Sequence, residues 1–165
     1  MLETERLILR RPEATDLQAW QAFFLSDRGV HIGGGPTKDE GVGWRAFASL
    51  LGHWEIHGWG PFTVLLARSG EAIGEVGPWY PAGWPEKEIS WTLWSAAHEG
   101  CGYAAEAALK VRAHVAADLG WTTAVSYVAR DNARSIALAK RLACVLDADA
   151  PTPRNEPALV FRHAL

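Results

Sequence analysis

The most constraining feature of this 165-residue chain is the junction between a strand-like run and a helix-like run. Residues 86–94 alternate as a strand does, the segment Gly100-Cys-Gly102 follows, and a helical pattern begins at Tyr103. Glycine permits a tight turn and lets a ligand come close to the main chain. The first N–H groups of the helix have no partners inside it. The junction is therefore suited to bind a phosphate or a pyrophosphate.

Length and composition predict a single globular domain over residues 1–165, with 48% hydrophobic and 21% charged residues. The net charge of −3 and the lack of a basic run speak against a nucleic-acid partner. No apolar stretch approaches the roughly 20 residues of a membrane span, and the charged start carries no signal segment, so we expect a cytoplasmic protein. Cys101 and Cys144 form no CxxC pair. We therefore expect neither a disulfide scaffold nor a bound metal.

The pattern of apolar residues predicts the order β-α-α-β-β-β-α-β-α-β. The first helix is capped at Thr15 or Asp16. The strand after the glycine loop should run parallel to 86–94, because a helix crosses between them. The result is a mixed, mostly antiparallel sheet with helices on its faces, of the α+β or α/β class. The expected strands are 6–10, 62–68, 72–80, 86–94, 123–129 and 158–164, and the later helices are 37–57, 103–119 and 132–143.

The glycine loop admits other interpretations. It could be a tight turn and nothing more. It also matches the relaxed dinucleotide fingerprint as Gly100-x-Gly102-x-x-Ala105. Two features argue against a dinucleotide-binding enzyme. The preceding strands look antiparallel, and strand 123–129 has no acidic residue at its end to hold a ribose, since Asp131 comes late.

Three segments, in order, carry a resemblance to a known family. They are Glu3-Thr-Glu-Arg-Leu-Ile-Leu-Arg10 at the start, Ser90-Trp-Thr-Leu93 with Gly100-Cys-Gly-Tyr-Ala-Ala-Glu-Ala107 at the junction, and Asn132-Ala-Arg-Ser135 with Lys140-Arg-Leu-Ala143 in the last helix. Together they resemble the GNAT superfamily of N-acetyltransferases, especially the ribosomal-protein acetyltransferase (RimJ/RimL-like) branch. The resemblance spans nearly the whole chain.

The resemblance implies a sheet that splays between strands 86–94 and 123–129 and an enzyme that moves an acetyl group from acetyl-CoA directly to a primary amine. The acceptor would be a protein N-terminus or a small molecule, and the protein a monomer or homodimer. A non-catalytic acyl-CoA-binding module is the alternative. The implied cofactor-binding residues are Leu93, Trp94, Glu99, Gly100, Cys101, Gly102, Tyr103, Ala104 and Asn132.

The chain departs from the family pattern at two functional positions. Ala97 stands where many members carry Arg or Gln, and Ala139 stands at the position of a proton-donating Tyr. Ser135 is then the candidate acid, directly or through water, and Asn132 could orient the cofactor. Both residues also suit a plain helix start, with Asn132 as the N-cap.

Glu88 and Glu75 are the candidate bases that take a proton from the amine. Both lie on predicted central strands, where desolvation would raise the pKa of a carboxylate. The alternative is that each faces solvent. Trp79, Trp84 and Trp91 could form an aromatic wall for the amine, or belong to the core. On the helix after the loop, Glu106 and Lys110 are expected to pair at i,i+4 spacing.

Overall fold

The computed structural model describes residues 1–165 except for the side chain of Asn155. Its eight strands form one sheet in the order β1-β2-β3-β4-β5-β6-β8-β7, and every neighbouring pair is antiparallel except β5–β6. The strands are β1 (Leu2–Glu3), β2 (Leu7–Arg10), β3 (Phe62–Leu66), β4 (Ala72–Trp79), β5 (Glu88–Leu93), β6 (Val125–Val128), β7 (Val145–Leu146) and β8 (Leu159–Arg162).

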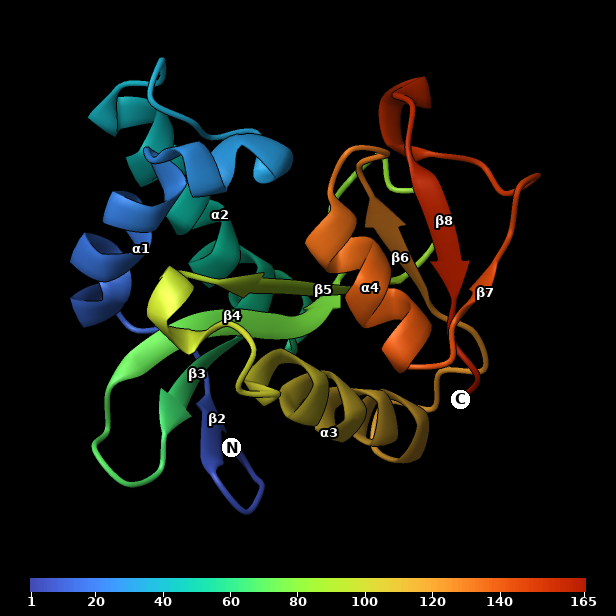
Figure 1. Ribbon diagram of the computed structural model, residues 1–165, viewed down its shortest axis with the longest axis horizontal. Helices are drawn as coiled ribbons and strands as arrows, with labels where there is room; N and C mark the ends of the chain where they lie inside the picture. Colours follow the sequence, from blue (N-terminus) through green and yellow to red (C-terminus); the bar gives the residue numbers. More distant parts are fainter.

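Helices lie on both faces of this sheet (Figure 1). They are α1 (Leu17–Phe24), α2 (Glu40–His57), α3 (Tyr103–Ala117) and α4 (Ala133–Arg141), with short 3-10 segments at 14–16, 27–32, 96–98 and 153–155. The alanine and valine stripe of α3 packs with the inner residues of β2 to β5 in the main core. Trp20, Phe23 and Phe24 of α1 pack with Phe47 and Leu50 of α2 in a second core. None of the helices described is long and apolar enough to cross a lipid bilayer.

The sheet forks between β5 and β6. β4 and β5 are paired at six positions, from Gly74–Leu93 to Trp79–Glu88. In contrast, β5 and β6 share the single register pair Glu88–Val125, after which β6 continues with β8 (Figure 1). The mixed sheet with a splay between two parallel strands is therefore confirmed.

Side chains replace main-chain pairing at the base of the fork. The Ser126 hydroxyl donates to the Ile89 carbonyl at 2.6 Å. Its oxygen lies 2.8 Å from His163 Nε2, so it accepts that N–H, because its own proton is already used. His163 Nδ1 lies 3.3 Å from Cys144 Sγ. Burial lowers the pKa of His163 to about 4, so the imidazole is neutral at pH 7. This chain of contacts holds β5, β6 and β8 together where the ladder ends.

Three local expectations were incomplete or wrong. The two-residue strands β1 and β7 were missed because they are too short to show a period. α2 begins at Glu40, three residues later than expected, because the Asp39 side chain accepts the Val42 N–H at 2.8 Å and caps the helix there. Glu106 pairs with Arg6 instead of Lys110, at 2.6 Å. That contact joins α3 to the start of β2.

Candidate active site

The glycine loop delivers the chain into α3 with its first N–H groups uncapped. Gly100 and Gly102 have φ angles of +74° and +84°, which residues with a Cβ rarely adopt. Gly102 is the N-cap of α3 and provides no side-chain acceptor. The loop and the first turn of α3 border a cavity of about 320 Å³. The helix start therefore offers free donors to an anion in that cavity.

The cavity, here called the loop cavity, lies between the end of β5, the start of α3, α4 and the 3-10 segment Asp27–Ile32. Most of the residues expected to bind the cofactor line it. They are Leu93, Glu99, Gly100, Gly102, Tyr103, Ala104 and Asn132, joined by the candidate acid Ser135.

Two of the residues expected to bind the cofactor, Trp94 and Cys101, do not line the loop cavity. The Trp94 N–H donates to the Ile73 carbonyl at 2.9 Å, and the ring packs in the second core. Along β5, successive residues point their main-chain N–H and C=O groups alternately toward β4 and toward the fork. Because those of Trp94 point toward β4, those of Trp91 and Leu93 point toward the fork. Cys101 is exposed, and its carbonyl accepts from Arg6 Nη1 at 3.0 Å. The Arg6 side chain thus anchors the loop from outside the cavity.

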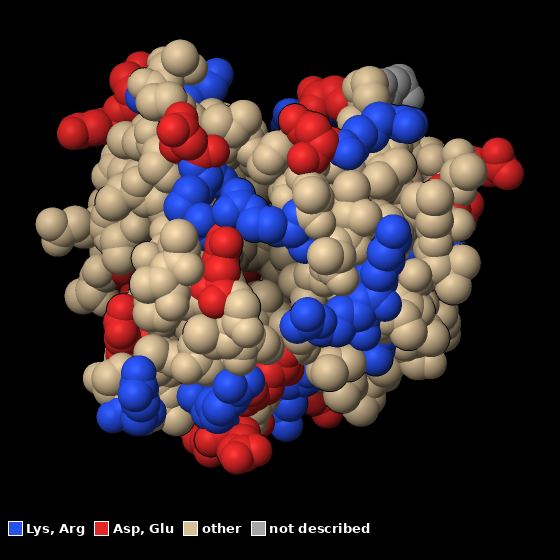
Figure 2. All heavy atoms as spheres, viewed as in Figure 1, with Lys and Arg blue, Asp and Glu red and all other residues tan. Residues whose placement is uncertain are grey.

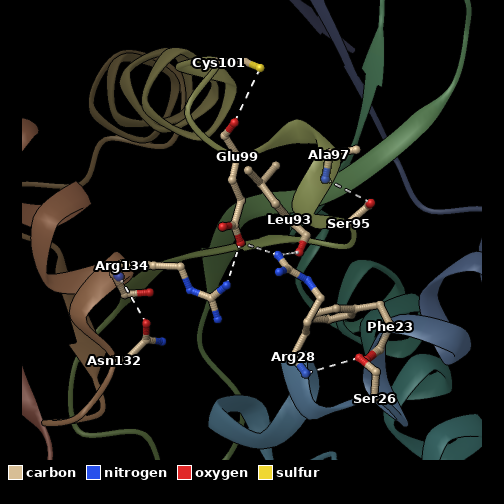
Figure 3. Close-up of polar contacts among 11 residues, drawn as sticks. Phe23, Ser26, Arg28, Leu93, Ser95, Ala97, Glu99, Cys101, Asn132 and Arg134 are labelled. Carbon is tan, nitrogen blue, oxygen red and sulfur yellow. Dashed lines mark hydrogen bonds and ion pairs between the residues drawn. The ribbon is translucent and has the colours of Figure 1, made fainter.

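An arginine pair that the sequence motifs did not reveal spans the loop cavity. Arg28 Nη2 and Arg134 Nη1 both bind Glu99 Oε1, at 2.6 and 2.7 Å (Figure 3). Arg28 comes from the 3-10 segment after α1, and Arg134 from the first turn of α4. Burial acts to raise the pKa of Glu99, but the two guanidinium groups hold it below its usual range.

Arg28 also donates to the Leu93 carbonyl at 2.8 Å, at the end of β5. Its guanidinium therefore sits where the fork opens. Figure 2 shows Lys and Arg side chains on both sides of the hollow in this face of the molecule, with carboxylates nearby. No sequence pattern around Arg28 could have located it, since the contact joins segments 65 and 71 positions apart.

A second cavity of about 510 Å³, here called the acceptor cavity, adjoins the loop cavity. Glu75, Glu88, Trp79 and Trp84 border it, together with Trp20 of α1. Residues that line both cavities mark their junction, and they are His31, Ile32, Trp91, Thr92, Asn132 and Ser135. A ligand in the loop cavity can therefore meet another in the acceptor cavity at this junction.

Glu75 and Glu88 are both buried, with 8% of each exposed. Burial raises the pKa of Glu75 to about 8, with a smaller opposing effect from the Trp20 indole. It raises the pKa of Glu88 to about 7, opposed by the Trp84 N–H and the Tyr127 main-chain N–H. Both carboxylates are therefore desolvated, as expected, and neither faces solvent.

The start of α4 combines capping with contacts at the junction. The Asn132 side chain accepts the Ser135 N–H at 3.1 Å, so Asn132 is the N-cap of the helix. The Ser135 hydroxyl accepts from Trp91 Nε1 at 3.2 Å. Ala139 is fully buried. Among the residues described, no group of three or more His, Cys, Asp or Glu side chains could hold a metal ion.

The forked sheet, the uncapped helix start and two meeting cavities suit a transferase that brings an anionic cosubstrate to a second substrate. The acetyltransferase (GNAT) domain model matches residues 6–145. The chain belongs to the GNAT acetyltransferase family, and it is an acetyl-CoA-dependent N-acetyltransferase.

Solved structures agree with this assignment. An acetyltransferase from Agrobacterium tumefaciens is 38% identical, with a TM-score of 0.91 over 99% of this chain and 94% of that one. Two more distant structures share the fold. One, described as a ribosomal-protein-serine acetyltransferase from Vibrio cholerae, is 18% identical, with a TM-score of 0.75 over 98% and 95% of the two chains. The other is AAC(6')-Ib with ribostamycin and coenzyme A, 17% identical, with a TM-score of 0.78 over 96% and 93%. A sequence comparison with curated proteins found no match.

Proposed function

We propose that residues 1–165 act as one catalytic domain that acetylates a primary amine held in the acceptor cavity, with Glu75 as the general base. The observation that carries this proposal is the position of Glu75. Its register partner on β5 is Thr92, which lines both cavities. A carboxylate with its pKa raised to about 8 can take a proton from an ammonium group near neutral pH.

The loop cavity fits the phosphate-bearing part of coenzyme A. The main-chain N–H groups of residues 100–104 would hold the diphosphate at the helix start. Arg28 and Arg134 supply two guanidinium groups beside them, which suits them to bind phosphate oxygens. Main-chain groups of Trp91 and Leu93 at the open edge of β5 would receive the pantetheine arm. This placement extends the sheet into the fork.

When bound, acetyl-CoA supplies an acetyl thioester and a thiolate leaving group. Glu75 accepts a proton from the acceptor ammonium, so that the neutral nitrogen can form the new C–N bond as the C–S bond breaks. As the amide forms, its nitrogen releases a second proton. The Ser135 hydroxyl at the junction can give its own proton to the sulfur and take up that second proton, directly or through water. No tyrosine can do so from the position of Ala139. Glu88 has the same chemistry as Glu75 but lies farther from the junction.

The acceptor is a protein N-terminus if the chain belongs to the RimJ/RimL-like branch. Support comes from the opening segment Glu3–Arg10 and from the shared fold of the Vibrio cholerae protein. A small-molecule amine is the second candidate, and the buried carboxylates of the acceptor cavity favour it.

Release of the CoA thiol, measured with a panel of peptides and small amines, tests the function. Turnover with at least one amine, lost in Glu75→Gln, is the expected result. Tight binding of acetyl-CoA without turnover on any amine would instead favour the binding module. Binding of NAD(P) in place of acetyl-CoA, seen as a higher thermal midpoint, would favour the dinucleotide alternative.

A further inference from the structure

The two buried carboxylates lie on one face of the sheet and both line the acceptor cavity, but they stand at different positions along the strands. Glu75 is opposite Thr92, and Glu88 is opposite Trp79. Side chains at alternate positions share a face, so Glu88 and Thr92 point the same way. Four residues of strand separate them, about 13 Å at roughly 3.3 Å per residue. Glu88 therefore cannot accept a proton from an amine that reacts beside Glu75.

Nothing described in the chain balances the charge of Glu88. Its carboxylate accepts from Trp84 Nε1 at 2.7 Å and from the Tyr127 main chain, both neutral donors. No Lys or Arg among the described side chains forms an ion pair with it. A buried carboxylate without a cationic partner is costly, and a cation from outside would relieve that cost.

The wall around Glu88 is also suited to a cation. Trp79 and Trp84 border the same cavity. The Arg154 guanidinium already lies over the Trp84 ring, 5.5 Å from its centroid, so one face of this ring receives a positive charge. Three carboxylates, those of Glu75, Glu88 and Glu156, line the cavity, and Arg154 is its one guanidinium among the described residues. His31 lies at the junction. The cavity therefore has an excess of carboxylates.

We propose that the acceptor is a diamine or longer polyamine, with one amine acetylated beside Glu75 and a second, still protonated, bound by Glu88 and Trp84. This inference rests on the proposed function and narrows it to a class of substrate. A monoamine of equal length would fill the cavity but leave Glu88 without a partner. Glu88 is then a specificity residue, and the chemical step belongs to Glu75.

The test compares diaminooctane, octylamine and diaminopropane at saturating acetyl-CoA, in the wild type, Glu88→Gln and Glu55→Gln. The long diamine spans the two carboxylates, the short one does not, and octylamine lacks the second charge. We expect kcat/KM for diaminooctane to exceed that for the other two by at least tenfold, mainly through KM. Glu88→Gln should reduce that ratio toward one. Glu55→Gln makes the same charge change on the exposed surface of α2 and should preserve the ratio.

Failure of this inference can be told apart from failure of the proposed function. Equal kcat/KM for diaminooctane and octylamine in the wild type would overturn it while leaving the acetyltransferase intact. An unchanged ratio of kcat/KM between diaminooctane and octylamine in Glu88→Gln would also overturn the inference. The thermal midpoint of Glu88→Gln, with a glutamine that can still accept from Trp84, shows whether the variant is folded. A purely structural Glu88 would lower that midpoint without changing the ratio between amines.

Discussion

Glu75 on β4 and Thr92 on β5 face each other across the antiparallel ladder, and the Thr92 hydroxyl is buried without a hydrogen-bond partner among the described residues. Thr92 lines both cavities, and Glu75 lines the acceptor cavity beside it. A buried hydroxyl left unpaired in the free protein is costly, and a substrate that supplies the missing partner recovers that cost. The pair therefore marks the place at which the reacting groups would come together.

Replacing the proposed base should slow turnover and leave cofactor binding unchanged. Glu75→Gln keeps the shape of the side chain but cannot accept the proton, and general-base catalysis contributes about 100-fold or more. We expect kcat to fall by about that factor, with the same KM for acetyl-CoA. Release of the CoA thiol at pH 8 measures both. A decrease below threefold would assign the proton to Glu88 or to water.

The contribution of Glu75 to stability should fall as the pH rises from about 5 to 8. Folding raises the pKa of Glu75 from 4.5 to about 8, so in that range the folded protein keeps a proton that the unfolded chain releases. Unfolding therefore becomes more favourable as the pH increases. Glu75→Gln removes the share of the dependence that belongs to Glu75, whereas Glu88 keeps its own. The variant should therefore be more stable than the wild type at pH 8, by on the order of a few kcal/mol. Urea unfolding of both proteins at pH 5 and pH 8 gives the comparison.

Glu55→Gln on the exposed surface of α2 is the control for that measurement, and it should follow the wild type at both pH values. A parallel pH dependence in Glu75→Gln and the wild type would show that Glu75 is not the group responsible. Glu88, whose pKa is raised to about 7, would then be tested by the same substitution.

A branched side chain in the glycine loop should weaken cofactor binding. Gly102→Val places a Cβ at a φ of +84° and puts its methyl groups beside the N–H groups proposed to hold the diphosphate. We expect the Kd for CoA to rise by at least tenfold, as measured by calorimetry. Gly120→Val is the matched control, because Gly120 also has a positive φ, +64°, but lies at the other end of α3. Equal loss of affinity in the two variants would contradict a specific role of the loop.

The arginine pair should contribute charge to cofactor binding. Arg134→Ala removes one guanidinium from the loop cavity, so we expect weaker CoA binding by about tenfold and a smaller dependence on salt. Lys140→Ala removes an exposed positive charge from the same helix outside the cavity. Its Kd should stay within twofold of the wild type. If both variants bind CoA as the wild type does, Glu99 and not a phosphate is the partner of Arg134.

The pattern of apolar residues predicted the order of the longer elements, and the family resemblance carried by the motifs around the glycine loop and the last helix implied the fork and the cofactor. These motifs are short runs of neighbouring residues, and the conformation of a turn or a helix start depends mainly on such local residue types. The positive φ angles of Gly100 and Gly102 and the N-cap at Asn132 follow from the residue types themselves. The same reasoning missed β1 and β7, because a two-residue strand is defined by its hydrogen bonds to a neighbouring strand and shows no pattern of its own.

The amino-acid sequence by itself determined the class of fold, the family and the two candidate carboxylates. Only the tertiary structure decided which main-chain groups remain free, because the Trp94 N–H is used by Ile73 across the ladder. It also brought Arg28 and Arg134 to Glu99, paired Glu106 with Arg6, and placed Glu75 opposite Thr92 and Glu88 opposite Trp79 on one face of the sheet. The physical reason is that register and burial arise from contacts between distant segments, which no local spacing encodes.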